Sequence, residues 1–288
     1  MRILHTGATG YLGQPIHQFL VRNGHHLIPF SSKERTGYEM LNLQRLDQFN
    51  TQLIHSGDIV LMAAAESAPD KCANELEYVR SVNVDGTIEF ITLCVERGAR
   101  VIFFSSDVVY GEKSSKFNEG IACNPCGEYA LMKHEVESHF LGMPEFKTIR
   151  LSYVFSRDDK FTKYLIHCDA LGSIAEVYNP FYRSAISRQD VIQGVSSLVD
   201  NWDDFPQPII NFGGPKMMSR IDIANTLKAS VLPNLNFRQV NPEANFFLNR
   251  PRRINMQSPL LETVLGRPCQ DLAAAIEEEF LEEKELFK

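Results

Sequence analysis

The chain has 288 residues, of which 36 are acidic and 29 are basic, and its formal net charge at neutral pH is −7. This length is sufficient for one large α/β domain or two smaller ones. The acidic balance and the lack of basic runs argue against nucleic-acid binding, and no apolar stretch approaches the roughly 20 residues that span a bilayer. The amino-terminal segment is too short and too rich in glycine for a signal peptide, so we expect a cytoplasmic protein.

Short apolar runs alternate with helical patterns in the first half of the chain. The predicted strands cover residues 3–5, 26–30, 58–65, 100–106 and 147–155. The predicted helices cover residues 11–22, 43–54, 73–97 and 128–140. Near-continuous apolar runs, such as VIFF at 101–104, are typical of parallel strands that are buried on both faces. The pattern predicts an α/β fold of Rossmann type, with a doubly wound parallel sheet.

The second half has a less regular pattern. Its predicted helices cover residues 160–171, 188–199, 219–231 and 271–287. Its predicted strands cover residues 174–178, 208–212 and 237–240, and residues 232–259 are otherwise predicted to be loops. We expect residues 1–155 to form the core, and residues 156–288 mainly a smaller α/β part, with about 188–213 returning to the core.

A glycine-rich turn lies between the first predicted strand and the first predicted helix. Gly7, Gly10 and Gly13 have the spacing GxxGxxG within TGATGYLG. The first glycine permits a tight turn, the second lets backbone N–H groups approach a diphosphate, and the third lets the helix pack closely on the sheet. The N-terminus of the helix then faces the negative charge. The turn predicts a dinucleotide site in the core. From this segment we assign to the site Gly7, Thr9, Gly10, Tyr11, Leu12 and Gly13.

Three further residues predict catalysis of proton transfer. Tyr129 and Lys133 are four residues apart, so a helix places them on one face. An adjacent ammonium is expected to lower the pKa of the phenol, which could then exchange a proton with a carbonyl oxygen as hydride is transferred. Ser106, at the end of a predicted strand, can donate a hydrogen bond to the same oxygen. We therefore assign Ser106, Tyr129 and Lys133 as the catalytic residues.

These motifs resemble those of the short-chain dehydrogenase/reductase superfamily, in its extended branch. Within that branch the chain is similar to the dTDP-4-dehydrorhamnose reductase family. The similar segments are residues 63–87, SSDVVYG at 105–111, RLSYVFS at 150–156, GGPKMMSRIDIA at 213–224 and NRPRRINM at 249–256. Pro125 also lies four residues before Tyr129, as in the family. Ala130 and Met132 depart from the family pattern, at positions that the chemistry does not use.

The resemblance implies a reductase that transfers hydride from a nicotinamide cofactor to a keto group of a nucleotide-linked sugar. Residues 1–155 would bind NAD(P), and the C-terminal part would bind the substrate. The cofactor site would also include Asn42, Leu43, Ala63, Ala64, Ala65, Tyr129 and Lys133. The substrate site would include Ser67 and Ser106.

Two other functions remain open at this point. The first is a nucleotide-sugar epimerase, which would oxidise and re-reduce its sugar with a retained NAD. The second is a cofactor-binding regulatory subunit without catalysis, like those of methionine adenosyltransferase. The complete set of Ser106, Tyr129 and Lys133 argues against the second alternative.

The end of the second predicted strand bears on the choice of cofactor. Rossmann sites specific for NAD usually place a carboxylate there, where it accepts from the ribose 2′-OH. Here the strand is followed by Ser31, Ser32 and Lys33, with Arg35 just beyond. Hydroxyls and cations can bind a 2′-phosphate through charge-assisted hydrogen bonds. We assign these four residues to the cofactor site and expect NADP(H) to be preferred, with NAD(H) as the alternative.

The remaining motifs are less specific. Arg252 and Arg253 are expected to bind the diphosphate of the substrate, with a solvated loop as the alternative. The pair of Cys123 and Cys126 has C-x-x-C spacing but no second pair that would complete a zinc site. We therefore expect no metal, no disulfide framework among the six cysteines, and a small-molecule substrate as the partner, with a homodimer as an open expectation.

Overall fold

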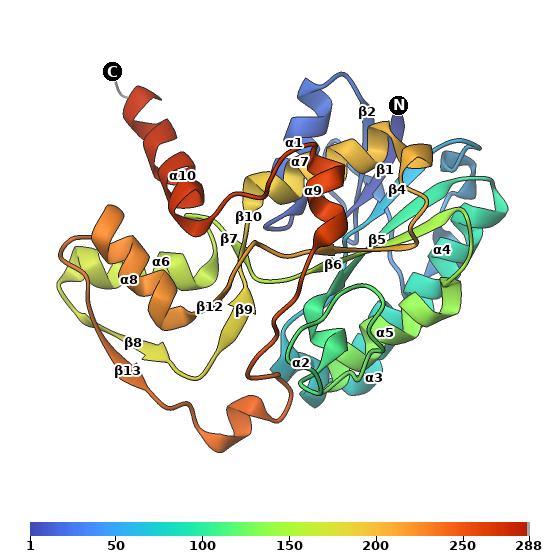
Figure 1. Ribbon diagram of the computed structural model, residues 1–288. Coiled ribbons are helices and arrows are strands. Elements are labelled where there is room, and N and C mark those ends of the chain that lie inside the picture. The colour runs from blue at the N-terminus through green and yellow to red at the C-terminus, as the bar shows by residue number, and fades with distance from the viewer. Residues whose placement is uncertain (287–288) are drawn as a thin grey trace.

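The computed structural model describes residues 1–286, in which seven parallel strands form the central sheet (Figure 1). The order of the strands across this sheet is β11-β6-β5-β4-β1-β2-β3. The chain therefore builds the sheet outward in two opposite directions, starting from the neighbouring strands β1 and β4. Open α/β sheets bind ligands at such a reversal, beyond the carboxyl ends of the strands. The strands are β1 (Arg2–Thr6), β2 (His26–Ser31), β3 (Glu39–Met40), β4 (Ile59–Met62), β5 (Arg100–Ser106), β6 (Phe146–Leu151) and β11 (Ile209–Phe212). The Rossmann-type fold predicted from the sequence is confirmed.

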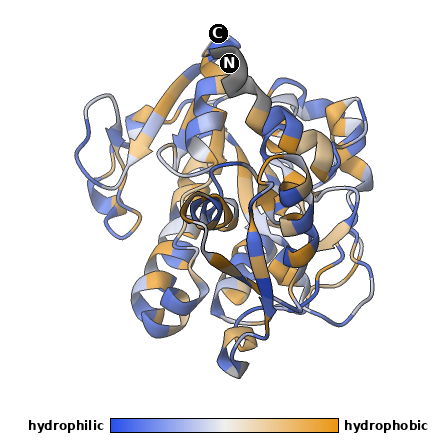
Figure 2. Cartoon of the chain, turned by 90° about the vertical axis from the view of Figure 1, so that its left-hand side faces the viewer, coloured by the Kyte–Doolittle hydropathy of each residue, from blue (hydrophilic) through white to orange (hydrophobic). Residues whose placement is uncertain are grey.

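Helices cover both faces of the sheet because successive strand residues point to opposite sides. Ile3 packs in a core with α1 (Gly13–Arg22), α7 (Arg188–Asp200) and α9 (Pro259–Leu265). The next residue, Leu4, packs in a second core with α4 (Thr87–Glu96) and α5 (Glu128–Phe140). Hydrophobic and hydrophilic residues accordingly alternate along the covering helices in Figure 2. Both cores are apolar, so the sheet is buried on both faces.

A smaller lobe lies beside the sheet (Figure 1). In it, β8 (Ile174–Tyr178) pairs in parallel with β13 (Asn236–Val240). A third core, which includes Leu165, Val177 and Leu227, joins this pair to the helices of the lobe. Those helices are α6 (Lys160–Leu171), α8 (Arg220–Ser230) and α10 (Leu272–Leu286). The last residue of the predicted C-terminal helix, Phe287, lies outside the described residues.

Two helix predictions in the first half are wrong. Residues 43–54 form two 3₁₀ turns, Leu46–Gln48 and Thr51–Leu53, instead of a helix. The Asn50 side chain accepts a hydrogen bond from the Gln52 N–H, and such local bonds compete with a helix. Residues 73–97 form several elements instead of one helix. These are α2 (Pro69–Asn74), α3 (Leu76–Arg80), a π-helical turn (Ser81–Gly86) and α4.

The π turn has a tertiary cause. The Asn83 side chain accepts from the backbone N–H of Glu66 and donates to its carbonyl oxygen, at 2.9 and 2.8 Å. A Cβ placed on Gly86 would lie 1.9 Å from the carbonyl oxygen of Leu43, so the helix passes close to that loop. These contacts between distant segments override the local helical pattern.

The remaining differences concern short elements. The strand predicted at 147–155 is divided into β6 and β7 (Val154–Phe155). The strand predicted at 58–65 ends at Met62. The sequence did not predict β3, α9, β9 (Tyr182–Ser184), β10 (Ile186–Ser187) or β12 (Met217–Ser219). The strands predicted at 208–212 and 237–240 are confirmed as β11 and β13. No helix in the described part of the chain is long and apolar enough to cross a membrane.

Candidate active site

The turn between β1 and α1 brings the main chain of two strands close together. Gly7 has a φ of +72°, and a Cβ placed there would lie 2.9 Å from the backbone of Ala63 and Ala64. A Cβ on Gly13 would lie 2.0 Å from the Gly7 carbonyl oxygen. The Thr6 hydroxyl accepts from the N–H groups of Ala63 and Ala64, at 3.0 and 3.1 Å. Only glycine therefore fits at these two glycine positions, where the turn packs against α1 and the end of β4.

A cavity of about 420 Å³ begins at this turn. Its walls include eleven of the residues that the sequence assigned to the cofactor: Gly7, Thr9, Gly10, Ser31, Ser32, Lys33, Asn42, Leu43, Ala63, Ala64 and Ala65. Arg35 is not among the lining residues, since its guanidinium lies over the Tyr38 ring at 5.1 Å from the centroid. Glu66, a carboxylate that the sequence analysis did not assign to the site, also lines this cavity. It forms an ion pair with Lys71 at 3.0 Å.

Ser106 and Tyr129 line a larger cavity of about 880 Å³. Ser106 ends β5, and Tyr129 lies in the first turn of α5. Tyr11 and Leu12 of the glycine turn also line this cavity. The Tyr11 hydroxyl is 2.7 Å from the Ser156 hydroxyl, which joins the turn to the segment before α6.

Lys133 lies beneath this wall instead of on it. Its ammonium donates to the Phe104 carbonyl oxygen at 2.7 Å and lies 5.9 Å from the centre of the Tyr129 ring. Burial lowers the pKa of Lys133 to about 8, although nearby Glu137 opposes this shift. The structure therefore places Lys133 next to the Tyr129 ring, on the same helix face.

The expected lowering of the Tyr129 pKa is not found. Burial raises the pKa of its phenol above the ordinary value, and the nearby Cys72 and Asp107 raise it further. Desolvation disfavours the phenolate more than the buried ammonium favours it. A protonated phenol is the form that can give a proton to a carbonyl oxygen, so this environment suits reduction.

Asp107 connects the catalytic strand to the smaller lobe. Its carboxylate is buried, accepts from the Ser152 hydroxyl at 2.8 Å, and lies 3.6 Å from Nε of Arg183 on β9. The Ser106 hydroxyl also donates to it, at 3.4 Å. Burial raises the pKa of Asp107, while Arg183 and the hydroxyl donors oppose the shift. The sequence did not single out Asp107, although it lies within the SSDVVYG segment.

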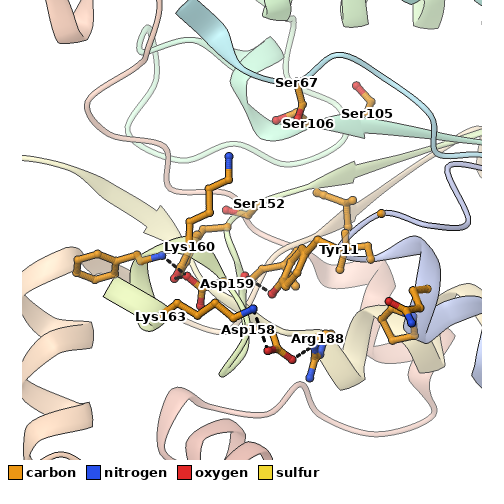
Figure 3. A pocket seen from close by; sticks show the side chains of 18 of the residues that line it. Tyr11, Ser67, Ser105, Ser106, Ser152, Asp158, Asp159, Lys160, Lys163 and Arg188 are labelled. Carbon is orange, nitrogen blue, oxygen red and sulfur yellow. Dashed lines mark hydrogen bonds and ion pairs between the residues drawn. The ribbon is translucent and has the colours of Figure 1, made fainter. Parts of the chain in front are cut away.

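The far wall of the larger cavity is rich in charge. Asp158 lies 3.2 Å from Lys163 and 3.0 Å from Arg188, so these two cations are paired. Among the described residues, no carboxylate lies within ion-pair distance of Lys160 or Arg220, which also line the cavity. In Figure 3 the Lys160 side chain extends toward the side where Ser67 and Ser106 lie. Two cations are thus available for an anionic ligand.

Arg220 is held in place by aromatic rings. Its guanidinium lies 4.4 Å from the centre of the Phe161 ring and 5.1 Å from that of Phe181. Arg220 directly follows Ser219, whose side chain forms a capping box with Asp222 at the start of α8. The capping sequence was visible in advance, but nothing in the local spacing indicated that the first residue of this helix faces a cavity.

The structure separates Arg252 and Arg253 from this cavity. Arg252 lines another cavity, of about 370 Å³, and lies over the Phe247 ring. Arg253 is exposed and lies 5.5 Å from the centre of the Tyr182 ring. Ser67, the other predicted substrate residue, lines the larger cavity with Ser106. The substrate role of the two arginines therefore stays a prediction.

Comparisons with known proteins point to one family. A family model described as the RmlD substrate binding domain matches residues 1–284. The dTDP-4-dehydrorhamnose reductase of Aggregatibacter actinomycetemcomitans is 26% identical over 234 residues, which cover 77% of this chain and 76% of that protein. Methionine adenosyltransferase 2 subunit beta of Xenopus tropicalis is 30% identical over 140 residues, which cover 47% of this chain and 41% of that protein.

Solved structures show the same fold. The dTDP-4-dehydrorhamnose reductase of Bacillus anthracis in complex with NADP has a TM-score of 0.82 at 19% identity, over 98% of this chain and 99% of that one. MoeE5 in complex with UDP-glucuronic acid and NAD has a TM-score of 0.80 at 19% identity, over 98% of this chain and all of that one (100%).

Proposed function

Since the chain belongs to the family of the RmlD substrate binding domain, we propose that it is an NAD(P)H-dependent reductase acting on a keto group of a nucleotide-linked sugar. One observation carries this proposal. Thr9 and Gly10 line both the cavity at the glycine turn and the cavity that holds Ser106 and Tyr129. A dinucleotide in the first cavity would therefore end next to the residues suited to proton transfer.

The residues of the first cavity fit a dinucleotide. Gly7 and Gly13 let the turn, α1 and the end of β4 pack together without side chains between them, which forms the tight turn that a diphosphate-binding loop needs. No side chain caps the N-terminus of α1, and among the described residues the N–H of Gly13 has no backbone partner, so it can donate to a diphosphate. The cofactor, when bound, supplies the hydride.

The residues of this chain position the carbonyl group of the substrate and supply the proton. Tyr129 donates its phenolic proton to the carbonyl oxygen, and Ser106 donates a hydrogen bond to the same oxygen. Lys133 holds its positive charge beneath the Tyr129 ring, which stabilises the phenolate left behind. In the structure the single hydroxyl proton of Ser106 is donated to Asp107 at 3.4 Å, so it would turn from Asp107 to the carbonyl oxygen when the substrate binds.

For the cofactor we propose a preference for NADPH. Ser31, Ser32 and Lys33 line the wall at the end of β2, where a carboxylate would accept from a ribose hydroxyl. Lys33 has the better placement for a 2′-phosphate, because Arg35 stacks on Tyr38 outside the cavity.

For the substrate we propose that Arg220 and Lys160 bind the diphosphate, with Ser67 near the sugar. Both cations face the cavity without a carboxylate partner in the described residues. Charge-assisted hydrogen bonds to phosphate oxygens would satisfy them. We retain Arg252 and Arg253 as candidates for a weaker contribution to binding the diphosphate. Arg252 lines the smaller cavity, and Arg253 lies at the surface.

The proposal also covers the organisation of the protein. Residues 1–155 and about 188–213 form the cofactor core, on which α9 also packs, and the rest of the described C-terminal residues mainly form the substrate part. A cytoplasmic location and a homodimer are included as expectations.

Turnover with purified protein tests the proposed function. dTDP-4-dehydrorhamnose is offered with NADPH or NADH, and both cofactor absorbance and sugar products are followed. Stoichiometric oxidation of the cofactor with formation of the reduced sugar is the expected result. Interconversion of sugars without net cofactor consumption would identify an epimerase, and cofactor binding without any turnover would favour a regulatory subunit.

A further inference from the structure

Away from the two cavities, three side chains with metal-ligating atoms meet between α5 and the loop that precedes it. The Cys123 thiol, an imidazole nitrogen of His134 and a carboxylate oxygen of Glu137 all lie within 4.8 Å of one another. They form the one group of three or more His, Cys, Asp and Glu side chains of this kind in the part of the chain that the structure describes. None of the three lines the cavity at the glycine turn or the cavity that holds Ser106 and Tyr129.

The backbone holds the three residues in this arrangement. His134 and Glu137 are three residues apart on α5, so they share a helix face. Cys123 lies in the preceding loop, where the Asn124 N–H donates to the Val109 carbonyl oxygen at 3.0 Å. Cys123 also packs against the small core that contains Val109. The site therefore joins a helix to a loop that is itself anchored.

One nitrogen in the group has no partner. Nδ1 of His134 is shielded from solvent and makes no hydrogen bond among the described residues. The nearest carboxylate oxygen, Oε2 of Glu137, is 3.9 Å away, which is too far for a hydrogen bond. A shielded nitrogen without a partner is destabilising unless a ligand satisfies it. Its lone pair is available to a metal ion.

Glu137 has the support that a ligating carboxylate needs. Its Oε2 accepts from Nε and Nη2 of Arg150, at 3.1 and 2.6 Å, and its Oε1 accepts from Nε at 3.2 Å. Both side chains are buried. Such outer partners fix the orientation of a ligating carboxylate while leaving lone pairs for the ion. Arg150 thus presents one face of Glu137 to His134 and Cys123.

We propose that Cys123, His134 and Glu137 form a zinc-binding site. A thiolate, an imidazole and a carboxylate are a donor set that Zn²⁺ accepts, with water in the fourth position. Zinc binding transfers the thiol proton of Cys123 to solvent and forms the Zn–S bond. The ion can enter from solvent, since the His134 side chain is 37% exposed.

This site extends beyond the proposed reductase activity and differs from the sequence-based expectation of no metal. The C-x-x-C spacing pairs Cys123 with Cys126, and the sequence predicted no zinc because no second pair completes such a site. In the structure, Cys126 instead points its sulfur toward the Leu248 carbonyl oxygen at 3.7 Å. The additional ligands come from α5, and the bound ion would attach the loop before Tyr129 to that helix.

Zinc titration of the full-length protein by calorimetry, with the metal content measured after dialysis, tests the site. We expect one zinc ion per chain. Cys123→Ser and His134→Gln should each weaken binding by at least about 100-fold, whereas the matched controls Cys126→Ser and His139→Gln should bind as the wild type does. No zinc binding, or an equal loss in the control variants, would overturn the proposal.

A second measurement needs no variant. Cys123 and Cys126 are both half-buried, so both thiols can be alkylated and quantified by mass spectrometry. Zinc should slow alkylation of Cys123 by at least about tenfold, because a metal-bound thiolate is shielded, and should leave the rate at Cys126 unchanged. Equal protection of both thiols, or of neither, would contradict the assignment.

Discussion

Main chain shapes the proposed cofactor cavity, whereas side chains from distant segments shape the proposed substrate cavity. At the first, Gly7 and Gly13 leave the backbone of β1 and α1 in contact with the end of β4. At the second, Lys160 and Arg220 enter from the starts of two helices that are 60 residues apart in sequence (220 − 160). We therefore expect one added methyl group at the glycine turn to disable binding in the first cavity. Loss of either cation should weaken binding in the second cavity only in part.

The strongest test of this comparison is Gly13→Ala. Its Cβ would lie 2.0 Å from the Gly7 carbonyl oxygen, so the turn or the helix must move. Because displacement of about 1 Å can cost roughly 100-fold, we expect the dissociation constant of NADPH to rise by at least that factor. Fluorescence titration measures this constant. Gly120→Ala, in an open loop, is the control, and an equal effect there would remove the specific role of the turn.

Arg220→Ala tests the substrate cavity. Loss of a charge-assisted hydrogen bond to phosphate should raise KM for the nucleotide sugar by about 10- to 100-fold and leave cofactor affinity unchanged. Lys160→Ala should have a smaller effect in the same direction. Steady-state kinetics give both values, with Arg238→Ala on β13 as the control.

The same kinetics decide between the two sets of arginines. Arg252→Ala and Arg253→Ala should each raise KM less than Arg220→Ala does. A larger effect of either would place the diphosphate at the smaller cavity, and the assignment to Arg220 would be abandoned.

These two cavities also explain what could be predicted from sequence. The turn, Ser106 and Tyr129 were accessible because contiguous residues determine local backbone geometry. Arg220 was not, because its approach to the cavity depends on how α8 packs against β8, β12 and α10. The predicted helix at 43–54 failed for a related reason, since Asn50 forms a local bond that propensity does not include.

A buried histidine makes the stability of the N-terminal part of the chain depend on pH. His5 on β1 is fully buried, stacks on His17 and has no hydrogen-bond partner among the described residues. Burial, and to a smaller extent the nearby His17, lower the pKa of His5 to about 3. The unfolded chain therefore binds the proton more readily, so stability is complete above pH 6.5 and is lost as the pH falls toward 3.

From that shift we expect His5 to reduce the free energy of unfolding by about 2 kcal/mol between pH 7 and pH 5. Urea unfolding at the two pH values measures the loss. His5→Leu should diminish it by this amount, whereas His167→Leu, exposed on α6 in the smaller lobe, should not. An unchanged pH dependence in His5→Leu would contradict this account.

Lys33→Ala should have the smallest effect. We expect NADPH to bind about five- to tenfold less tightly, because one exposed cation contributes modestly to binding a 2′-phosphate, while NADH affinity stays the same. Arg35→Ala is the matched control and should change neither constant. Tighter binding of NADH than NADPH by the wild type would reverse the proposed preference.

The central claim is that a cofactor bound in the first cavity transfers hydride to a carbonyl carbon of the substrate, while Tyr129 protonates the carbonyl oxygen. The most direct test uses NADPH carrying deuterium at the transferable position, dTDP-4-dehydrorhamnose, and mass spectrometry of the product. We predict one deuterium on the former carbonyl carbon with the wild type, and turnover at least about 100-fold slower with Tyr129→Phe, which should still bind NADPH. Product without deuterium, or near-normal turnover by Tyr129→Phe, would contradict the account.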